Sequence, residues 1–150
     1  MKLINHAYYS TGDVATGSNL IPLSPAIISN AQGDQFMTLS YTPADKDSVI
    51  EVEVKAYLSN SAPANQLSAA LFQDAIVDAL ACGSQEQANA DGLVHVSFSH
   101  YMKSKNLTPI KLNVRAGASL AGKTTFNGKA GALVWGGLLK SHIIVREYKM

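Results

Sequence analysis

The last third of the chain, from Ile110 to Tyr148, restricts the possible folds more than any other stretch. Apolar and polar residues alternate from Ile110 to Arg115, and side chains with this period point to opposite faces of a β-sheet. Three further short runs follow, separated by turns that contain glycine: 123–126, 132–135 and 141–148. Asn127-Gly128 is typical of a tight hairpin turn, because a type I′ turn needs positive φ at both central residues. We therefore expect four antiparallel strands here.

Val49 to Leu58 carries the clearest strand pattern in the rest of the chain. Its apolar residues at even positions alternate with charged ones, which is typical of a sheet with one buried and one solvated face. Similar alternations predict strands at 35–42 and 93–102. The polar stretch Gly83–Gly92 is expected to be a loop.

The stretch from Leu67 to Ala81 has two possible interpretations. Phe72 and Ile76 fit helical spacing, and alanine, a good helix former, is abundant. The same residues also fit a buried strand that enters a turn at Gln73-Asp74. We favour strand–turn–strand, because the surrounding pattern is β throughout. The whole chain then has about eight to ten short strands at intervals of roughly 8–12 residues, which predicts an all-β fold, an antiparallel β-sandwich of jelly-roll type.

The first 25 residues differ in character from the rest. Ile4 to Tyr9 is long enough for a short strand, and the polar stretch after it is typical of an exposed loop. Pro22 and Pro25 keep their predecessors extended and suit a sheet edge. We therefore expect residues 1–25 to form an extended N-terminal arm and residues 26–150 a single β-sandwich domain. The candidate docking residues of the arm are Tyr8, Tyr9, Leu20 and Ile21.

The low content of charged residues bears on the surface of the protein. Charged residues make up 15% of the 150 residues, against about 25% in a typical soluble domain. The formal net charge of +1 produces no strong field that would attract nucleic acid or an anionic membrane, so neither is expected as a partner. The depletion indicates a neutral polar surface, a surface buried against other subunits, or a mixture of both, which we favour.

Cysteine content and apolar runs restrict the compartment. The single cysteine, Cys82, cannot form an internal disulfide, so no oxidising compartment is implied, and we interpret it as a small apolar residue beside a turn. The N-terminus has no apolar stretch typical of a signal peptide, and no run approaches the roughly 18 apolar residues of a membrane span. We expect synthesis in a cytoplasm.

No constellation of residues for catalysis, cofactor binding or metal binding emerges from the sequence. His95 and His100 are five apart on one predicted strand, so they point to opposite faces and cannot share a metal. Asp45 and Asp47 lie in a turn that lacks the further oxygen ligands calcium requires. No phosphate-binding loop or nucleophile elbow occurs. We therefore expect no enzymatic activity, and we assign no catalytic, cofactor-binding or metal-binding residue.

Aromatic residues on predicted solvated faces are candidates for contact with another molecule. Tyr57 and Tyr101 could stack on sugars, or they could lie in a subunit interface, where tyrosine is enriched. We favour the interface. The candidate contacts with another subunit or partner are Tyr57, Tyr101 and Trp135.

The order of several turn and strand motifs resembles that of a known family. The motifs are Gly33-Asp34-Gln35-Phe36-Met37-Thr38-Leu39, Thr42-Pro43, Ile50–Val54, Ala70–Asp74, Ala79-Leu80-Ala81, Ser97–Met102, Val114–Gly117, Phe126-Asn127-Gly128, Gly136-Gly137 and Ser141–Glu147. Residues 20–148 are similar in this respect to a β-sandwich module of bacteriophage virion proteins, found in tail fibres and spikes and as stand-alone virion components. The resemblance also favours strands over a helix at 67–81.

The resemblance implies a jelly-roll domain that assembles as a homotrimer on the outside of a phage particle, without catalytic residues. Tail-fibre relatives usually carry a long shaft or a large enzymatic domain, and we expect this chain to be a self-contained surface component instead. We therefore expect a non-enzymatic structural protein of a tailed bacteriophage virion, a capsid decoration, cement or head-fibre protein, assembled in the host cytoplasm. Its partners would be other copies of itself and the major capsid protein or tail proteins. The alternative is a tail-fibre or spike tip module that binds a host surface glycan.

Overall fold

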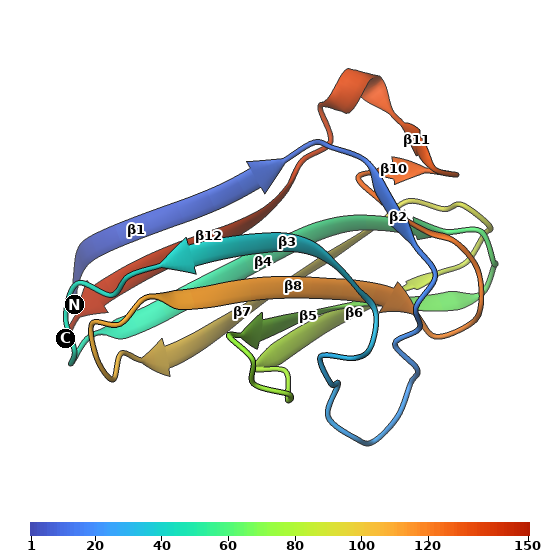
Figure 1. Cartoon of the computed structure of the whole chain (residues 1–150). Coiled ribbons are helices and arrows are strands. Elements are labelled where there is room, and N and C mark those ends of the chain that lie inside the picture. The colour runs from blue at the N-terminus through green and yellow to red at the C-terminus, as the bar shows by residue number, and fades with distance from the viewer.

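Two antiparallel sheets stack face to face in the computed structural model, which describes residues 1–150 (Figure 1). The first sheet has the order β1-β12-β4-β7, and the short strands β9 and β2 continue it beyond β12 along the same edge of β4. Its strands are β1 (Lys2–Thr11), β12 (Ser141–Lys149), β4 (Val49–Asn60), β7 (Val94–Lys103), β9 (Thr124–Phe126) and β2 (Ala15–Gly17). The second sheet has the order β3-β8-β5-β6. Its strands are β3 (Asp34–Tyr41), β8 (Ile110–Ala118), β5 (Asn65–Gln73) and β6 (Ala81–Gln87).

The chain alternates between the two sheets in the manner of a jelly roll, which confirms the predicted fold class. β1 runs antiparallel to β12 with Lys2 opposite Lys149, so the two termini lie side by side (Figure 1). No helix in the structure has the length and apolar character needed to cross a membrane.

The core lies between the facing sheets and contains 18 buried apolar residues. The expected alternation of β4 is present, since Val52 and Val54 are fully buried while Glu53 between them is half-buried on the other face. Val54 lies opposite Ile143 of β12 and Phe98 of β7. This continuous apolar layer holds the two sheets together, because burial of apolar area is the main favourable term in folding.

Residues 65–87 confirm strand–turn–strand, because β5 and β6 pair across a turn at 74–80. The prediction of a loop at Gly83–Gly92 is wrong for residues 83–87, which belong to β6. A polar edge strand shows no alternation of apolar and polar residues, so its sequence resembles that of a loop.

Gly83 of β6 has a packing role: a Cβ at this position would come within 2.9 Å of Cδ1 of Phe98, so glycine permits β6 to approach β7 closely. Cys82 is exposed on the same strand.

The hairpin turn in the last third lies three residues later than Asn127-Gly128. The tight turn joins β10 (Gly128–Lys129) to β11 (Ala132–Leu133), and its central residues Ala130 and Gly131 have φ of 51° and 77°. Asn127 also has positive φ, 61°, but it forms the corner between β9 and β10. There the Asn127 amide donates to the Thr11 carbonyl at 2.8 Å. The short helix η1 (Trp135–Gly137) follows β11.

The N-terminal segment is part of the sandwich, which corrects the expectation of an arm outside it. β1 pairs along its length with β12. Residues 18–33 then cross the outer face of the second sheet, where the Ile21 N–H donates to the Ala118 carbonyl at 3.0 Å and the Ile21 side chain is buried. Arg115 donates from Nε to the Gln32 carbonyl at 2.8 Å and fixes the far end of the segment. What the segment covers is the chain's own second sheet.

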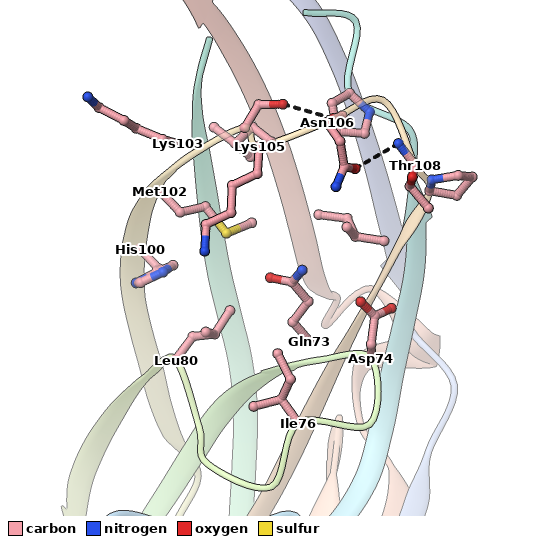
Figure 2. A pocket seen from close by; sticks show the side chains of 15 residues that line it. Gln73, Asp74, Ile76, Leu80, His100, Met102, Lys103, Lys105, Asn106 and Thr108 are labelled. Carbon is pink, nitrogen blue, oxygen red and sulfur yellow. Dashed lines mark hydrogen bonds between the residues drawn. The ribbon is translucent and has the colours of Figure 1, made fainter. Parts of the chain in front are cut away.

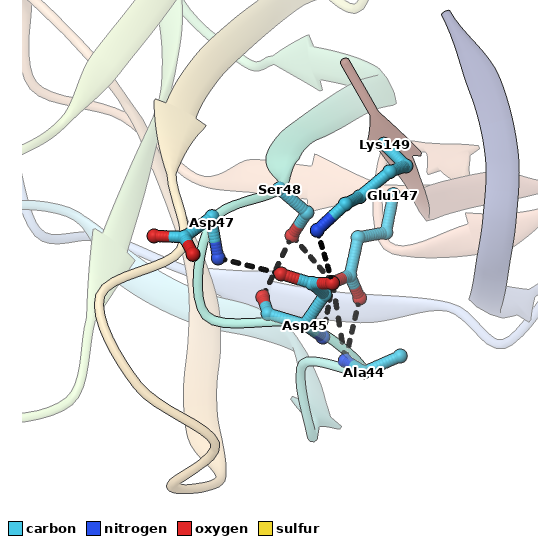
Figure 3. A network of polar contacts seen from close by, with 6 residues as sticks. All are labelled: Ala44, Asp45, Asp47, Ser48, Glu147 and Lys149. Atoms are coloured by element: carbon cyan, nitrogen blue, oxygen red, sulfur yellow. Dashed lines mark hydrogen bonds and ion pairs between the residues drawn. The ribbon is translucent and has the colours of Figure 1, made fainter.

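A buried carboxylate fastens the loop after β3 to the end of the first sheet (Figure 3). Glu147 points inward from β12, is fully buried, and accepts hydrogen bonds from the hydroxyls of Tyr41 and Ser48. The backbone N–H groups of Ala44 and Asp45 also donate to it, at 2.9 and 3.0 Å. Burial acts to raise the pKa of Glu147, but these donors outweigh it and the pKa lies below its usual value. The carboxylate is therefore held charged inside the fold.

Candidate functional site

The side chains of the first sheet that point away from the core form a continuous surface, called here the outer face. It presents four tyrosines and one isoleucine drawn from β1, β4, β7 and β12: Tyr8, Tyr57, Tyr101, Tyr148 and Ile144. Tyr8 and Tyr101 are the most exposed, at 70% and 61%. No other segment of the chain lies over this face (Figure 1). It differs in this from the second sheet, whose outer side is covered by residues 18–33.

Glu51 is the centre of a polar network on the outer face. Its carboxylate accepts hydrogen bonds from the Tyr101 hydroxyl at 2.6 Å and from the Tyr148 hydroxyl at 3.3 Å. Arg146 lies 3.3 Å from the same carboxylate. The Tyr101 hydrogen bond is the largest cause of a lowered pKa of Glu51, and it raises the pKa of Tyr101. These cross-strand contacts fix the orientation of two tyrosine rings on an otherwise solvated surface.

A second group of titratable side chains lies farther along the same face. Nε2 of His142 is 3.2 Å from a carboxylate oxygen of Glu53. The Tyr57 ring stacks on His95 with centroids 5.2 Å apart, and the Lys55 amine lies 5.6 Å from the Tyr57 centroid. Partial burial, and then the charges of Lys55 and His142, lower the pKa of His95. No group of three or more His, Cys, Asp or Glu residues in the chain has the arrangement of a metal site.

The candidate contacts predicted from the sequence divide between two places. Tyr57 and Tyr101 both lie on the outer face, as their alternation predicts. Trp135 lies elsewhere, in η1, where it is 70% exposed beside the exposed side chains of Leu133 and Leu138. The structure therefore brings two of the three candidate contacts onto one surface.

The four residues predicted to dock the arm are also separated by the structure. Tyr8 belongs to the outer face, whereas Tyr9, the next residue of β1, packs inward against the core. Leu20 is 36% exposed, whereas the side chain of Ile21 is buried between its own segment, residues 18–33, and the second sheet. Ile21 is therefore not available to dock on another protein, because its side chain already stabilises the covered face of the second sheet.

A pocket of about 390 Å³ opens between the sheets, below the loop that joins β7 to β8. Figure 2 shows Lys105 reaching into it from that loop and Gln73 reaching in from the end of β5. His100 of β7 also lines the pocket. Sequence reasoning did not identify this group, because its members come from three separate segments. The only signal was His100, a polar residue on the inward face of a predicted strand.

The pocket combines an apolar floor with polar walls. Five apolar side chains line it: Ile50, Ile76, Leu80, Met102 and Ile110. Asp74 stands on the wall formed by the turn after β5, where its Oδ1 accepts a hydrogen bond from the Lys111 N–H at 2.9 Å. The volume lies within the roughly 300–1,000 Å³ typical of small-ligand sites, which combine such apolar surfaces with a few polar groups.

No family model matches the chain, and no curated protein matches it in sequence. Its fold is similar to that of Eiger TNF from S. frugiperda, with a TM-score of 0.53 and 12% identity over 99% of this chain and 94% of that chain. This similarity shows the jelly-roll fold and nothing finer, because the identity is low.

Two weaker similarities support no inference. One is to the T13 viral particle of IBDV, with a TM-score of 0.47 and 13% identity over 97% of this chain and 36% of that chain. The other is to the C-terminal domain of EclA, a sugar-binding protein, with a TM-score of 0.38 and 14% identity over 83% of this chain and 76% of that chain.

Proposed function

We propose that this protein is a non-enzymatic structural component on the exterior of a tailed bacteriophage virion, a decoration, cement or head-fibre protein that acts as a homotrimer. The observation that supports the proposal best is the uncovered outer face, with its four tyrosines and Ile144 on four strands. One sheet of the sandwich is covered by the chain itself, and the other is left for a second molecule.

The composition of the outer face suits contact between subunits. Tyrosine is enriched in protein interfaces, since it combines a large apolar ring with a hydroxyl that can find a partner. Glu51 already orients Tyr101 and Tyr148, so less side-chain entropy would be lost on association. The low charge content of the whole chain, 15%, agrees with burial of part of the surface in an assembly.

The assignment to a virion is supported by the sequence resemblance to phage virion modules together with the jelly-roll fold. Jelly rolls occur in viral capsid proteins, but the fold by itself is shared by many functions. Within the proposal, the major capsid protein or a tail protein is the second partner. Trp135 and the exposed apolar residues beside it, away from the outer face, are available for that contact.

Sedimentation equilibrium at micromolar concentration tests the homotrimer, and we expect the mass of three chains. Ile144→Lys places a charge in the middle of the outer face, between Tyr8 and Glu53, and should give a folded monomer. The matched control is Leu107→Lys, which introduces the same charge at an exposed apolar residue between β7 and β8 and should leave the trimer intact. A monomeric wild-type protein would contradict the homotrimer.

Gold-labelled antibody against the chain tests the position on the particle. Electron micrographs of purified virions should show label on the outside of the head. Label confined to the tail would replace capsid decoration by a tail role, and unlabelled virions, with labelled protein only in the lysate, would contradict the assignment to the particle.

A further inference from the structure

Several hydrogen-bonding groups in the pocket between the sheets have no partner within the protein. The amine of Lys105 has no ion pair or hydrogen bond, although Figure 2 shows it inside the pocket. Gln73 directs its side-chain amide into the same space. The Asn106 Oδ1 accepts a hydrogen bond from the Thr108 N–H at 2.9 Å, which leaves the Asn106 NH₂ group free. The convergence of these groups around one cavity of about 390 Å³, which apolar side chains also line, indicates a ligand.

The charges around the pocket favour a ligand with one negative charge. Lys105 supplies a positive charge inside it, and Figure 2 shows Lys103 extending away at the rim. Asp74 faces the same space, with one carboxylate oxygen held by the Lys111 N–H. A dianion such as a phosphate monoester would be repelled by Asp74, whereas a single carboxylate can lie near Lys105 and leave Asp74 to accept hydrogen bonds.

The rest of the ligand must combine hydroxyl groups with an apolar surface. The second carboxylate oxygen of Asp74 can accept hydrogen bonds from hydroxyls, and the Gln73 amide can accept through its oxygen and donate through its NH₂ group. His100 is half-buried, and burial lowers its pKa, so the neutral ring both donates and accepts at neutral pH. Met102 and Leu80 provide an apolar surface for the C–H face of a sugar ring.

We propose that this pocket binds a pyranose that carries a carboxylate, with the carboxylate on Lys105 and Asn106 and the ring hydroxyls on Asp74 and Gln73. The site lies between the sheets and not on the outer face, so the proposal does not rest on the homotrimer. The proposed pocket is thus a binding site for a saccharide with one negative charge.

Saturation-transfer NMR on the full-length protein tests the proposal with methyl β-D-glucuronide as the probe and methyl β-D-glucoside as its neutral counterpart. We expect transfer to the glucuronide, and shifts of the Met102 methyl signal on titration. The glucoside should bind about tenfold more weakly, since it lacks the charge-assisted contact with Lys105. An oligosaccharide with an internal glucuronate distinguishes a polymeric source from a free sugar acid: tighter binding than the monosaccharide indicates a polymer, and equal binding indicates the single residue.

Lys105→Gln should weaken glucuronide binding about tenfold and leave glucoside binding unchanged. The matched control is Lys129→Gln, an identical change of charge on exposed β10, which should alter neither. Failure of both sugars to bind, equal binding of the two, or unchanged glucuronide binding in Lys105→Gln would each overturn the proposal.

Discussion

The two faces of the first sheet are built from the same strands but differ in what they do. On the inner face, Val52, Val54 and Ile143 are fully buried and pack against the second sheet. On the outer face, one residue along, Glu51 and Glu53 form hydrogen bonds and ion pairs with neighbouring strands. A shift of one residue exchanges the faces, so the inner face fixes the register and leaves the outer face free to vary.

Glu147 and Glu51 show the same difference between the inner and outer faces within one residue type. Glu147 points inward and its charge is enclosed by hydroxyl and backbone donors from the loop after β3. Glu51 points outward and is held by Tyr101, Arg146 and Tyr148. Both have a lowered pKa, but Glu147 is fully buried whereas Glu51 is only partly buried, so removal of the two carboxylates should have very different effects.

The largest effect is expected from a charge on the inner face. Val54→Asp places an unpaired carboxylate in the fully buried core, which costs several kcal/mol, comparable with a total stability of about 5–15 kcal/mol. We expect no cooperative unfolding transition by circular dichroism. Lys55→Asp, at the next position on the outer face, is the control and should melt cooperatively. A folded Val54→Asp protein would contradict the assignment of the inner face.

Glu147→Gln should be the next most destabilising change. The amide leaves one oxygen to accept and turns an NH₂ group toward the donors of Ala44, Asp45 and Ser48. Unfolding in urea should show a loss of about 3 kcal/mol. Glu51→Gln removes a carboxylate from the outer face and should cost about 1 kcal/mol or less. Equal losses for the two variants would remove the distinction between the faces.

Stability should fall in acid because of these carboxylates. The pKa of Glu147 lies below its usual value of 4.5 in the folded protein. The unfolded chain therefore binds the proton more tightly, and the stabilisation is complete above about pH 4.5 and disappears as pH falls through the folded pKa. Urea titrations across this range should give a shallower pH dependence for Glu147→Gln than for the wild type. Glu86→Gln, the same substitution at an exposed residue of β6, is the matched control.

Most of the sandwich follows from the sequence because its long strands alternate. β4, β7, β8 and β12 have one apolar and one polar face, and local alternation reports which side is buried. The same rule fails for β6, a polar edge strand. It also fails for Ile21, since the burial of that residue depends on the course of residues 18–33 across a sheet formed later in the chain.

The candidate sites are less predictable because each combines distant segments. Tyr57 and Tyr101 could be placed on a solvated face by alternation, but their partners depend on register: Tyr57 opposite His95, and Tyr101 opposite Glu51. The pocket brings together Gln73, at the end of β5, and Lys105, in the loop between β7 and β8. No local sequence pattern predicts that these two side chains lie close together. It follows only after the jelly-roll order of strands is known.

The smallest expected effect concerns the Tyr101 hydroxyl alone. Tyr101→Phe removes the hydrogen bond that contributes most to the lowered pKa of Glu51, so this pKa should rise toward its usual value. The change in stability should be smaller than for any variant above, because Tyr101 is exposed to solvent on the outer face. NMR titration of the Glu51 side-chain carboxyl carbon measures this pKa directly. Tyr57→Phe, near the other end of β4 from Glu51, is the control and should leave the pKa of Glu51 unchanged. An unchanged pKa in Tyr101→Phe would mean that Arg146 and Tyr148, and not Tyr101, hold the Glu51 carboxylate on the outer face.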